Sequence, residues 1–596
     1  MDEYSRQDVF DYIIEEEQKF KTETVSLGTN WQWNMYKHID HSFLMKNSKF
    51  ITGENDGFTR VFKQIILPIL NVAYRTEGFN VERVQAYVDD PDYYHMSAIS
   101  NKYHRKWALE NGLDKEIDAS ATSYVDYGLT LVKDVNDKKP KSVDLMTVAF
   151  CNQSDILSGP ICLKHNFSLE ELLDMKGTWE DDKIDLAIQK ATCTVDKDGK
   201  ITKTPNKNIE VYELHCTWPE SYLTGNPEDT KYVRQMHIVA SYKDDKSESK
   251  GITLFKGKQK QIFKALKRDD IWGRACGRGG IEEIMPEQVW TNYSMLQLKK
   301  LLDTLGMILW KTDDNTLGQK TDLKNIKHNT VLELQEGKDF NAVSMPNPNI
   351  NAFDAFASRM EQNARTTGSA SDPQLGLNPV SGTPLGTTQI VTAEGTGIHQ
   401  YRAKQFGDFW NEIYETQITK YLTSDLEKGD KWLEELSLKE LQEVAERVSV
   451  NEANDRIKKG LLEGKTITKE GQDALIDFIK QEFLKGGKKR FMEAMKDEFK
   501  ELPIKIKWNV NNTNDDFVSD VSKLNNVMRL ALSNPQALSN PEIAELFNQI
   551  LEKSGLTPID FTNLTKRAII SPMNQPITQQ NTQLSGQTNN NLSLTQ

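Results

Sequence analysis

The chain has 596 residues, of which 37% are hydrophobic and 27% are charged, and its formal net charge is −13. That length exceeds what one core ordinarily organises, so we expect several modules in a largely folded protein. The acidic balance argues against a tight, salt-sensitive nucleic-acid binder, which would carry a basic footprint. No apolar run approaches the roughly 18 residues of a transmembrane helix, and we expect neither membrane insertion nor a cleaved secretion signal.

The five cysteines form no Cys-x-x-Cys pair. An odd number of cysteines argues against a disulfide framework, and the absence of a Cys-x-x-Cys pair argues against a zinc ribbon. We therefore expect folding in a reducing cytoplasm, with no cofactor. The residues concerned are Cys151, Cys162, Cys193, Cys216 and Cys276.

The first 260 residues predict an α+β region with much antiparallel sheet. Helical spacing of apolar residues indicates helices over residues 1–25, 57–78 and 92–111. Stretches rich in Val, Thr and Tyr then predict strands. These cover residues 120–135, 142–151, 211–218 and 232–242, with a hairpin over 191–204 that turns at 196–199.

A long helix is predicted to begin at Pro286 and to end at Trp310. Proline is tolerated in a first helical turn because that N–H has no partner within the helix. Apolar residues occupy most of the circumference, so the helix should be buried on more than one side. Burial in a globular core and packing between neighbouring subunits both remain open.

The region after this helix contains short strands, a second helix and an unusual loop. Residues 311–346 are mixed, and the second helix is predicted over residues 350–364. Residues 366–386 are rich in Gly, Ser, Thr and Pro, and their only charged residue is Asp372. A nearly uncharged loop of this length inside a folded region is usually functional or disordered.

The rest of the chain is predicted to be mostly helical. A helix over residues 387–422 should be weakened or kinked at Gly395 and Gly397. Later elements are helices over 431–447, 472–485, 516–533 and 541–554, and a strand over 502–510. Residues 573–596 are uncharged and rich in Gln, Asn, Thr and Ser, so we expect disorder there.

Two local patterns have competing interpretations. Asp89, Asp90, Asp92 and His95 could hold a divalent cation, as a nuclease needs, but such residues also form a turn and a helix N-cap, which we favour. The Gly-Arg pairs at 273–274 and 277–278 could form an anion site or a flexible connection, and we favour the connection. No recognisable catalytic arrangement appears, and we do not expect an enzyme.

The order of these modules resembles the portal proteins of tailed bacteriophages, of the short-tailed-phage type. The resemblance is strongest over residues 271–422. Trp272-Gly273-Arg274, followed by Glu282 and Glu283, looks like the Tyr-Gly-Arg-plus-acid lead into the portal stem helix. The tryptophan stands where the family has tyrosine.

The resemblance implies a portal fold with an α/β wing, a helical stem, a small β-containing clip and a helical crown. Its modules follow chain order: wing 1–285, stem helix 286–310, clip 311–346, returning stem helix 347–365, tunnel loop 366–386, long kinked helix 387–423, wing return 424–512, crown 513–572 and disordered tail 573–596.

The resemblance also implies a function and a location in the virion. About twelve copies would form a ring at one capsid vertex, assembled in the host bacterium's cytoplasm, for DNA packaging, genome retention, tail attachment and ejection. Double-stranded DNA would pass without sequence-specific binding, and a neutral or acidic wall would avoid gripping its phosphates. Implied partners are the packaging terminase, the head–tail adaptor, and the major capsid and scaffolding proteins. The alternatives are another virion structural or adaptor protein, or a metal-dependent nuclease.

Three groups of residues acquire roles from the resemblance. The DNA-channel loop contains Thr366, Thr367, Gly368, Ser369, Asp372, Gly376 and Gly382. Packing between stem subunits involves Trp290, Leu298, Leu301, Leu305 and Ile308. Docking of the motor and the adaptor involves Lys324 and Lys327.

Overall fold

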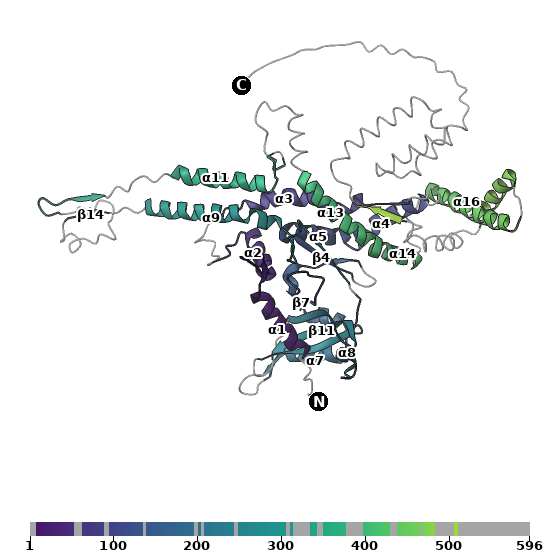
Figure 1. The fold of residues 1–596 in the computed structure, drawn as a ribbon, viewed down its shortest axis with the longest axis horizontal. Coiled ribbons are helices and arrows are strands. Elements are labelled where there is room, and N and C mark those ends of the chain that lie inside the picture. The colour runs from purple at the N-terminus through teal and green to yellow at the C-terminus, as the bar shows by residue number, and fades with distance from the viewer. Residues whose placement is uncertain are drawn as a thin grey trace, which may run out of the picture.

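The computed structural model has three projecting parts joined at a helical centre (Figure 1). A β-rich lobe contains the N-terminal helix, a long two-helix hairpin extends to one side, and a helical arm extends to the other. The residues described are 8–52, 62–88, 94–134, 139–195, 201–203, 208–243, 248–260, 262–305, 310–313, 334–342, 350–372, 374–376, 397–428, 438–464, 468–482, 485 and 506–510.

The lobe is built on a five-stranded antiparallel sheet in the order β12-β11-β10-β7-β6. Its strands are β6 Val148–Phe150, β7 Ile161–Phe167, β10 Ile209–Pro219, β11 Tyr232–Lys243 and β12 Ser249–Lys258. The sheet is covered on both faces, because alternate residues of β10 enter different cores. Tyr212 and Leu214 pack with α1 (Val9–Thr22), whereas Val211 packs with α7 (Asp181–Thr192).

The strands predicted over residues 211–218 and 232–242 are confirmed, whereas the one predicted over 142–151 is interrupted by a 3-10 turn over Leu145–Thr147 and leaves β6 as its second part. The hairpin expected over residues 191–204 is also present, as β8 (Cys193–Val195) paired with β9 (Ile201–Lys203). Its turn lies outside the described residues. Helices and strands are interspersed along the chain, so the α+β class is confirmed.

The centre packs helices around a largely apolar core. It contains α3 Ile66–Glu77, α4 Tyr94–Glu110, α5 Leu113–Tyr127 and α13 Gly397–Ile413. A small sheet β13-β4-β5 and the strand pair β16-β3 border it. These strands are β3 Gln85–Val88, β4 Leu129–Lys133, β5 Lys141–Ser142, β13 Phe263–Lys267 and β16 Ile506–Asn509.

The strand predicted over residues 120–135 is wrong in its first half. Those residues complete α5, and β4 begins only at Leu129. Gly128 separates the two elements, because its φ of 73° ends the helix in the left-handed conformation that glycine adopts freely. Burial of Tyr124 and Val125 in the central core outweighs the strand preference of such residues.

The projecting hairpin consists of α9 (Gly280–Leu305) and α11 (Ile350–Thr367), which lie side by side in Figure 1. Near its far end, β14 (Trp310–Thr312) pairs with β15 (Phe340–Ala342). Both helices were predicted, but α9 begins six residues before Pro286, and Trp310 belongs to a strand. The proline lies on an exposed side of α9, where its ring meets solvent.

Of the helix expected over residues 387–422, the described part comprises α13, a π-helical turn over Tyr414–Ile418, and α14 (Thr419–Lys428). The π turn is an irregularity that the sequence did not predict. The kink expected at Gly395 and Gly397 stays a prediction, because the residues before Gly397 lie outside the described part. The arm beyond contains α16 (Leu438–Leu462) and a helix over residues 469–482.

Several predicted features lie outside the described residues. These are the two helices over 516–533 and 541–554, the tail over 573–596, and the residues Asp89, Asp90, Asp92, Ile308, Lys324, Lys327, Gly382 and Gly395.

Glycines bring three backbone segments into contact at the start of the hairpin. A Cβ added at Gly277 would lie 1.8 Å from the Arg268 carbonyl oxygen, and one at Gly279 would lie 2.3 Å from that of Asp126. A Cβ added at Gly128 would lie 2.5 Å from the Gly277 carbonyl oxygen. Backbone atoms cannot move aside cheaply, so these positions exclude any side chain.

We predict that Gly277→Ala lowers the free energy of unfolding by more than about 2 kcal/mol, because the methyl group overlaps the Arg268 carbonyl. Gly397→Ala is the matched control, since a Cβ there meets nothing within 4 Å. It should change stability by less than about 0.5 kcal/mol. Guanidinium unfolding followed by circular dichroism measures both, and equal effects would contradict the packing argument.

Candidate functional site

The candidate site is the root of the hairpin, where the segment after β13 leads into α9. The sequence pattern there favoured a flexible connection. The structure instead buries Arg274, Ala275, Cys276 and Gly277, so this prediction is wrong. Trp272, in contrast, has 91% of its surface exposed.

Arg274 is the first anchor of the root. Its guanidinium donates to both carboxylate oxygens of Glu282, at 2.9 Å from Nη1 and 2.6 Å from Nη2, and its Nε donates to the Cys276 carbonyl at 2.8 Å. It also lies over the rings of Trp31 and Trp33, at 5.6 and 5.1 Å from their centroids. These rings belong to β2 (Trp31–Trp33), which pairs with β1 (Val25–Leu27). The donors are thus committed within the protein, which disfavours the alternative of an anion site.

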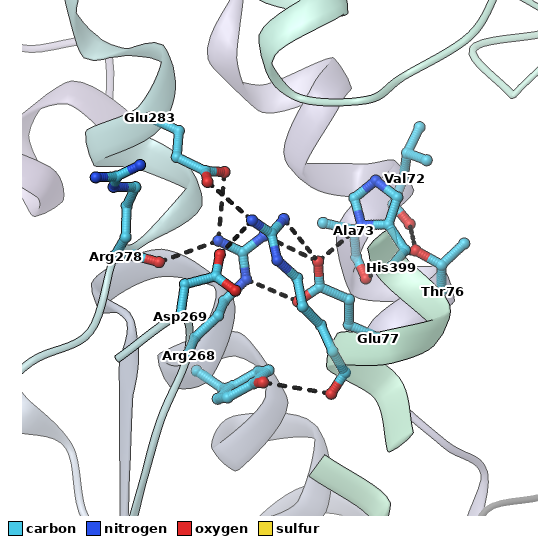
Figure 2. Close-up of polar contacts among 11 residues, drawn as sticks. Val72, Ala73, Thr76, Glu77, Arg268, Asp269, Arg278, Glu283 and His399 are labelled. Atoms are coloured by element: carbon cyan, nitrogen blue, oxygen red, sulfur yellow. Dashed lines mark hydrogen bonds and ion pairs between the residues drawn. The ribbon is translucent and has the colours of Figure 1, made fainter. Parts of the chain in front are cut away.

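A larger network of charged side chains forms the second anchor, drawn in Figure 2. Glu77, the last residue of α3, accepts from Arg268 Nε at 2.8 Å and from its Nη2 at 2.9 Å. Arg268 Nη1 donates to the Arg278 carbonyl at 3.1 Å and to Glu283 at 3.4 Å. The side chains of Glu77 and Arg268 are 0% and 1% exposed. This bidentate pair therefore joins α3 to the segment after β13 away from water, and the contact of Nη1 with Glu283 extends the connection to the start of α9.

Helix α13 contributes the other half of the network. His399 Nδ1 donates to Glu77 Oε1 at 2.7 Å. Arg402 Nη2 donates to Glu283 Oε1 at 2.8 Å and also to Asp269. Figure 2 shows these groups converging from separate elements of the fold. The network thus ties α3, α9 and α13 together at one point.

The charges of the network explain how a buried glutamate stays ionised. Burial works to raise the pKa of Glu77, but the Arg268 guanidinium and the His399 hydrogen bond outweigh it and lower that pKa to about 2. Two arginines, Arg268 and Arg402, face three carboxylates, those of Glu77, Asp269 and Glu283. Removing either arginine would leave buried negative charge uncompensated.

A third ionic contact holds the same region from the side of α2 (Met35–Lys46). Lys46 Nζ donates to Asp126 Oδ2 at 2.6 Å, and the Tyr74 hydroxyl donates to the other oxygen of that carboxylate. Burial nevertheless raises the pKa of Asp126 above its usual value. Asp126 is also the residue whose carbonyl packs against Gly279. Charged anchors therefore surround the hairpin root on three sides.

The residues predicted to pack between stem subunits lie on α9. Trp290 is 53% exposed, and Leu298 and Leu301 are half-buried. Leu305 ends the helix, and Ile308 falls outside the described residues. Their packing role stays a prediction.

The predicted DNA-channel loop begins later than the sequence pattern indicated. Thr366 and Thr367 form the end of α11, and Gly368 follows it in a buried position, where a Cβ would lie 2.3 Å from Ile69. Ser369 has a φ of 51°, Asp372 accepts from Arg365 at 3.0 Å, and Gly376 has a φ of 78°. The first residues of this segment are thus packed against the body, while Gly382 lies beyond the described part.

The docking residues Lys324 and Lys327 are not among the described residues. The same holds for Asp89, Asp90 and Asp92 of the candidate cation cluster. Within the described ranges, no group of three His, Cys, Asp or Glu side chains is placed to hold a metal ion. The nuclease alternative therefore gains no support from this part of the chain.

Sequence reasoning missed the members of the buried network. Glu77 is 191 residues from Arg268 and 322 from His399, so no local pattern links them. The available signal was the density of Arg, Gly and paired Glu over residues 268–283, which exceeds what a simple connection needs.

Comparison of the chain with protein-family models and with curated protein sequences finds no match. None of the helices in the described ranges has the length and apolar character needed to cross a membrane. The hairpin and its buried root are the features of the described structure that bear on function.

We predict that Arg268→Met lowers the free energy of unfolding by about 3–5 kcal/mol, because it leaves Glu77 buried without its main partner. Arg456→Met is the matched control: it removes an exposed i,i+4 pair with Glu452 and should cost less than about 0.5 kcal/mol. Guanidinium unfolding of both variants tests this. Similar losses in the two would mean that the network contributes no more than a surface pair.

A second prediction concerns the stability of the fold at acidic pH. Because the pKa of Glu77 is about 2 in the folded chain and its ordinary value is 4.5, its ionisation stabilises the fold above about pH 4.5. That contribution should be lost as the pH falls from about 4.5 towards 2. Glu77→Gln should be less stable at neutral pH but show a shallower loss of stability below pH 4.5. Identical pH profiles for the two proteins, measured by thermal unfolding, would refute the assignment.

Proposed function

We propose that this chain is a bacteriophage portal subunit, which forms a ring channel for double-stranded DNA at one vertex of a capsid. In this proposal the lobe is the wing, α9 and α11 are the stem, and the region around β14 and β15 belongs to the clip. Support comes from the arrangement itself: an α+β body carries a helical hairpin with a strand pair near its far end. The resemblance in module order points the same way.

One observation carries the proposal: the outer side of α9 is exposed and apolar. Val289, Trp290 and Tyr293 are 45%, 53% and 53% exposed, and their spacing places them on one side of the helix. Phe356 of α11 adjoins them, with its ring 6.2 Å from that of Trp290. A contiguous group of exposed aromatic residues is typical of a protein–protein interface.

A neighbouring copy of the chain is the partner we propose for this side. The exposed residues occur on the projecting hairpin, whose root is the part that the described residues of the body cover. In a head-to-tail ring, each hairpin would pack between two others, and rotation would close the assembly. Such packing would bury the apolar residues of α9 on more sides than the single chain does.

The charge of the chain fits a conduit rather than a DNA clamp. A net charge of −13 in each subunit disfavours the counterion release that drives tight phosphate binding. In this proposal DNA passes without sequence readout, and the loop predicted over residues 366–386 contributes a nearly uncharged surface to the channel beyond its packed first residues. The clip, with Lys324 and Lys327, would contact the packaging terminase and later the head–tail adaptor.

The main alternative is another virion structural or adaptor protein. Exposed aromatic residues on a projecting hairpin would serve such a protein as well, so the discriminating property is a closed ring with a central hole. A metal-dependent nuclease would instead cleave DNA as a pure protein with divalent cations.

We predict that the purified chain forms rings of about twelve subunits with a mass of about 817 kDa, twelve times 68.1 kDa. Trp290→Ala combined with Tyr293→Ala should shift the population to monomers, because it removes the aromatic contact. Leu186→Ala is the control, since this leucine is 40% exposed on α7 in the lobe. Native mass spectrometry and negative-stain images give the readout. A wild-type chain that stays monomeric at micromolar concentration would contradict the portal proposal.

A further inference from the structure

Helix α13 combines two features that usually lower the stability of a fold: buried ion pairs in its first turns and a π turn after its last residue. His399 and Arg402 in its first turns enter the buried charge network, and the π turn Tyr414–Ile418 follows its last residue. Buried ion pairs seldom stabilise more than apolar packing would, and π turns are uncommon and often functional. The combination on one helix needs an explanation.

The π turn is held in place by specific hydrogen bonds. The Thr419 N–H and its hydroxyl both donate to the Tyr414 carbonyl, the hydroxyl at 2.7 Å, and Trp508 Nε1 donates to that hydroxyl at 2.8 Å. A π turn contains one residue more than a regular helical turn. Moving this extra residue along the helix would rotate α13 by about 100° and translate it by about 1.5 Å.

The buried side of α13 is incompletely hydrogen-bonded in its present position. Among the described residues, fourteen buried side-chain polar atoms have no hydrogen-bond partner, and five of them belong to α13 and the π turn. The deficit of hydrogen bonds within the chain is therefore concentrated on α13 and the π turn. The five atoms are His399 Nε2, Arg402 Nε, Trp410 Nε1, Asn411 Oδ1 and Gln417 Oε1.

We propose that α13 is a two-position latch on the hairpin root. In the position described, Arg402 bridges Asp269 and Glu283 while His399 contacts Glu77, which holds α13 to α9 and α3. In the second position the extra residue of the π turn has moved into α13, and rotation withdraws Arg402 and His399 from the network. This latch goes beyond the portal proposal and holds whether or not the chain forms a ring.

The latch couples two parts of the chain that are far apart in sequence. Glu283 lies in the first turn of α9, so releasing Arg402 frees one of the carboxylates that fix the hairpin root. Arg268 remains to hold Glu77, because its bidentate contact does not involve α13. The root would therefore loosen rather than unfold when the latch opens.

Deletion of Glu415 tests the latch in the full-length chain by hydrogen exchange with mass spectrometry. Glu415 is exposed within the π turn, and removing one residue there restores a regular helix with both flanks in place. The latch predicts that α13 amides exchange faster than those of equally buried α5 in the wild type. In the deletion variant, exchange of α13 should slow by at least about tenfold, because the second position is lost.

Two further variants complete the test. Deletion of the exposed Lys404, where α13 has no extra residue, should disrupt the fold of this helix and speed its exchange. Arg402→Met should speed exchange in α13 and in the first turn of α9, but not in α5. The latch would be overturned if deleting Glu415 sped exchange, left it unchanged or prevented folding, or if Arg402→Met affected α5 equally.

Discussion

The contact between Glu77 and Arg268 is the constraint on which the hairpin depends. It lies where α3 ends, where β13 gives way to the glycine-rich segment, and where α9 begins. Its fork geometry fixes direction as well as distance, since two parallel hydrogen bonds allow little rotation. Arg402 and His399 then bring α13 to the same point. Ile281 and Ile284 of α9 also enter the central apolar core, so the buried charges add a directional constraint to apolar packing at the hairpin root.

Joining α3, α9 and α13 through buried charges costs the free energy of removing those charges from water, so the charges must provide something that apolar contacts do not. Apolar side chains of similar volume would often stabilise the fold equally well or better. They would, however, tolerate several angles between α9 and the body, because dispersion contacts have little directional preference. The root instead uses arginines with fixed donor geometry and glycines whose backbones touch. For a hairpin proposed to pack between identical neighbours in a ring, a fixed angle matters more than maximal stability.

Local patterns predicted the elements well but not the site. The richness of β10 and β11 in strand-favouring residues and the apolar spacing of α9 and α11 were sufficient, because each element buries a face that its own sequence encodes. Residues 120–127 were mistaken for a strand, since burial against the central core decided their conformation. Local patterns could not predict the buried network, because Glu77, Arg268 and His399 are far apart in the sequence and meet only after the chain folds. The segment over residues 268–280 was misjudged because glycine signals flexibility in sequence, whereas here it permits close packing.

A distance measurement across the root shows whether the buried charges fix the direction of the hairpin. Spin labels at exposed positions 303 on α9 and 186 on α7 would report the angle between hairpin and lobe by pulsed electron spin resonance. If the buried charges fix this angle, the wild-type distance distribution is narrow, and Arg402→Met broadens it while the fold remains intact. An equally narrow distribution in Arg402→Met, or a broad one in the wild type, would contradict the account.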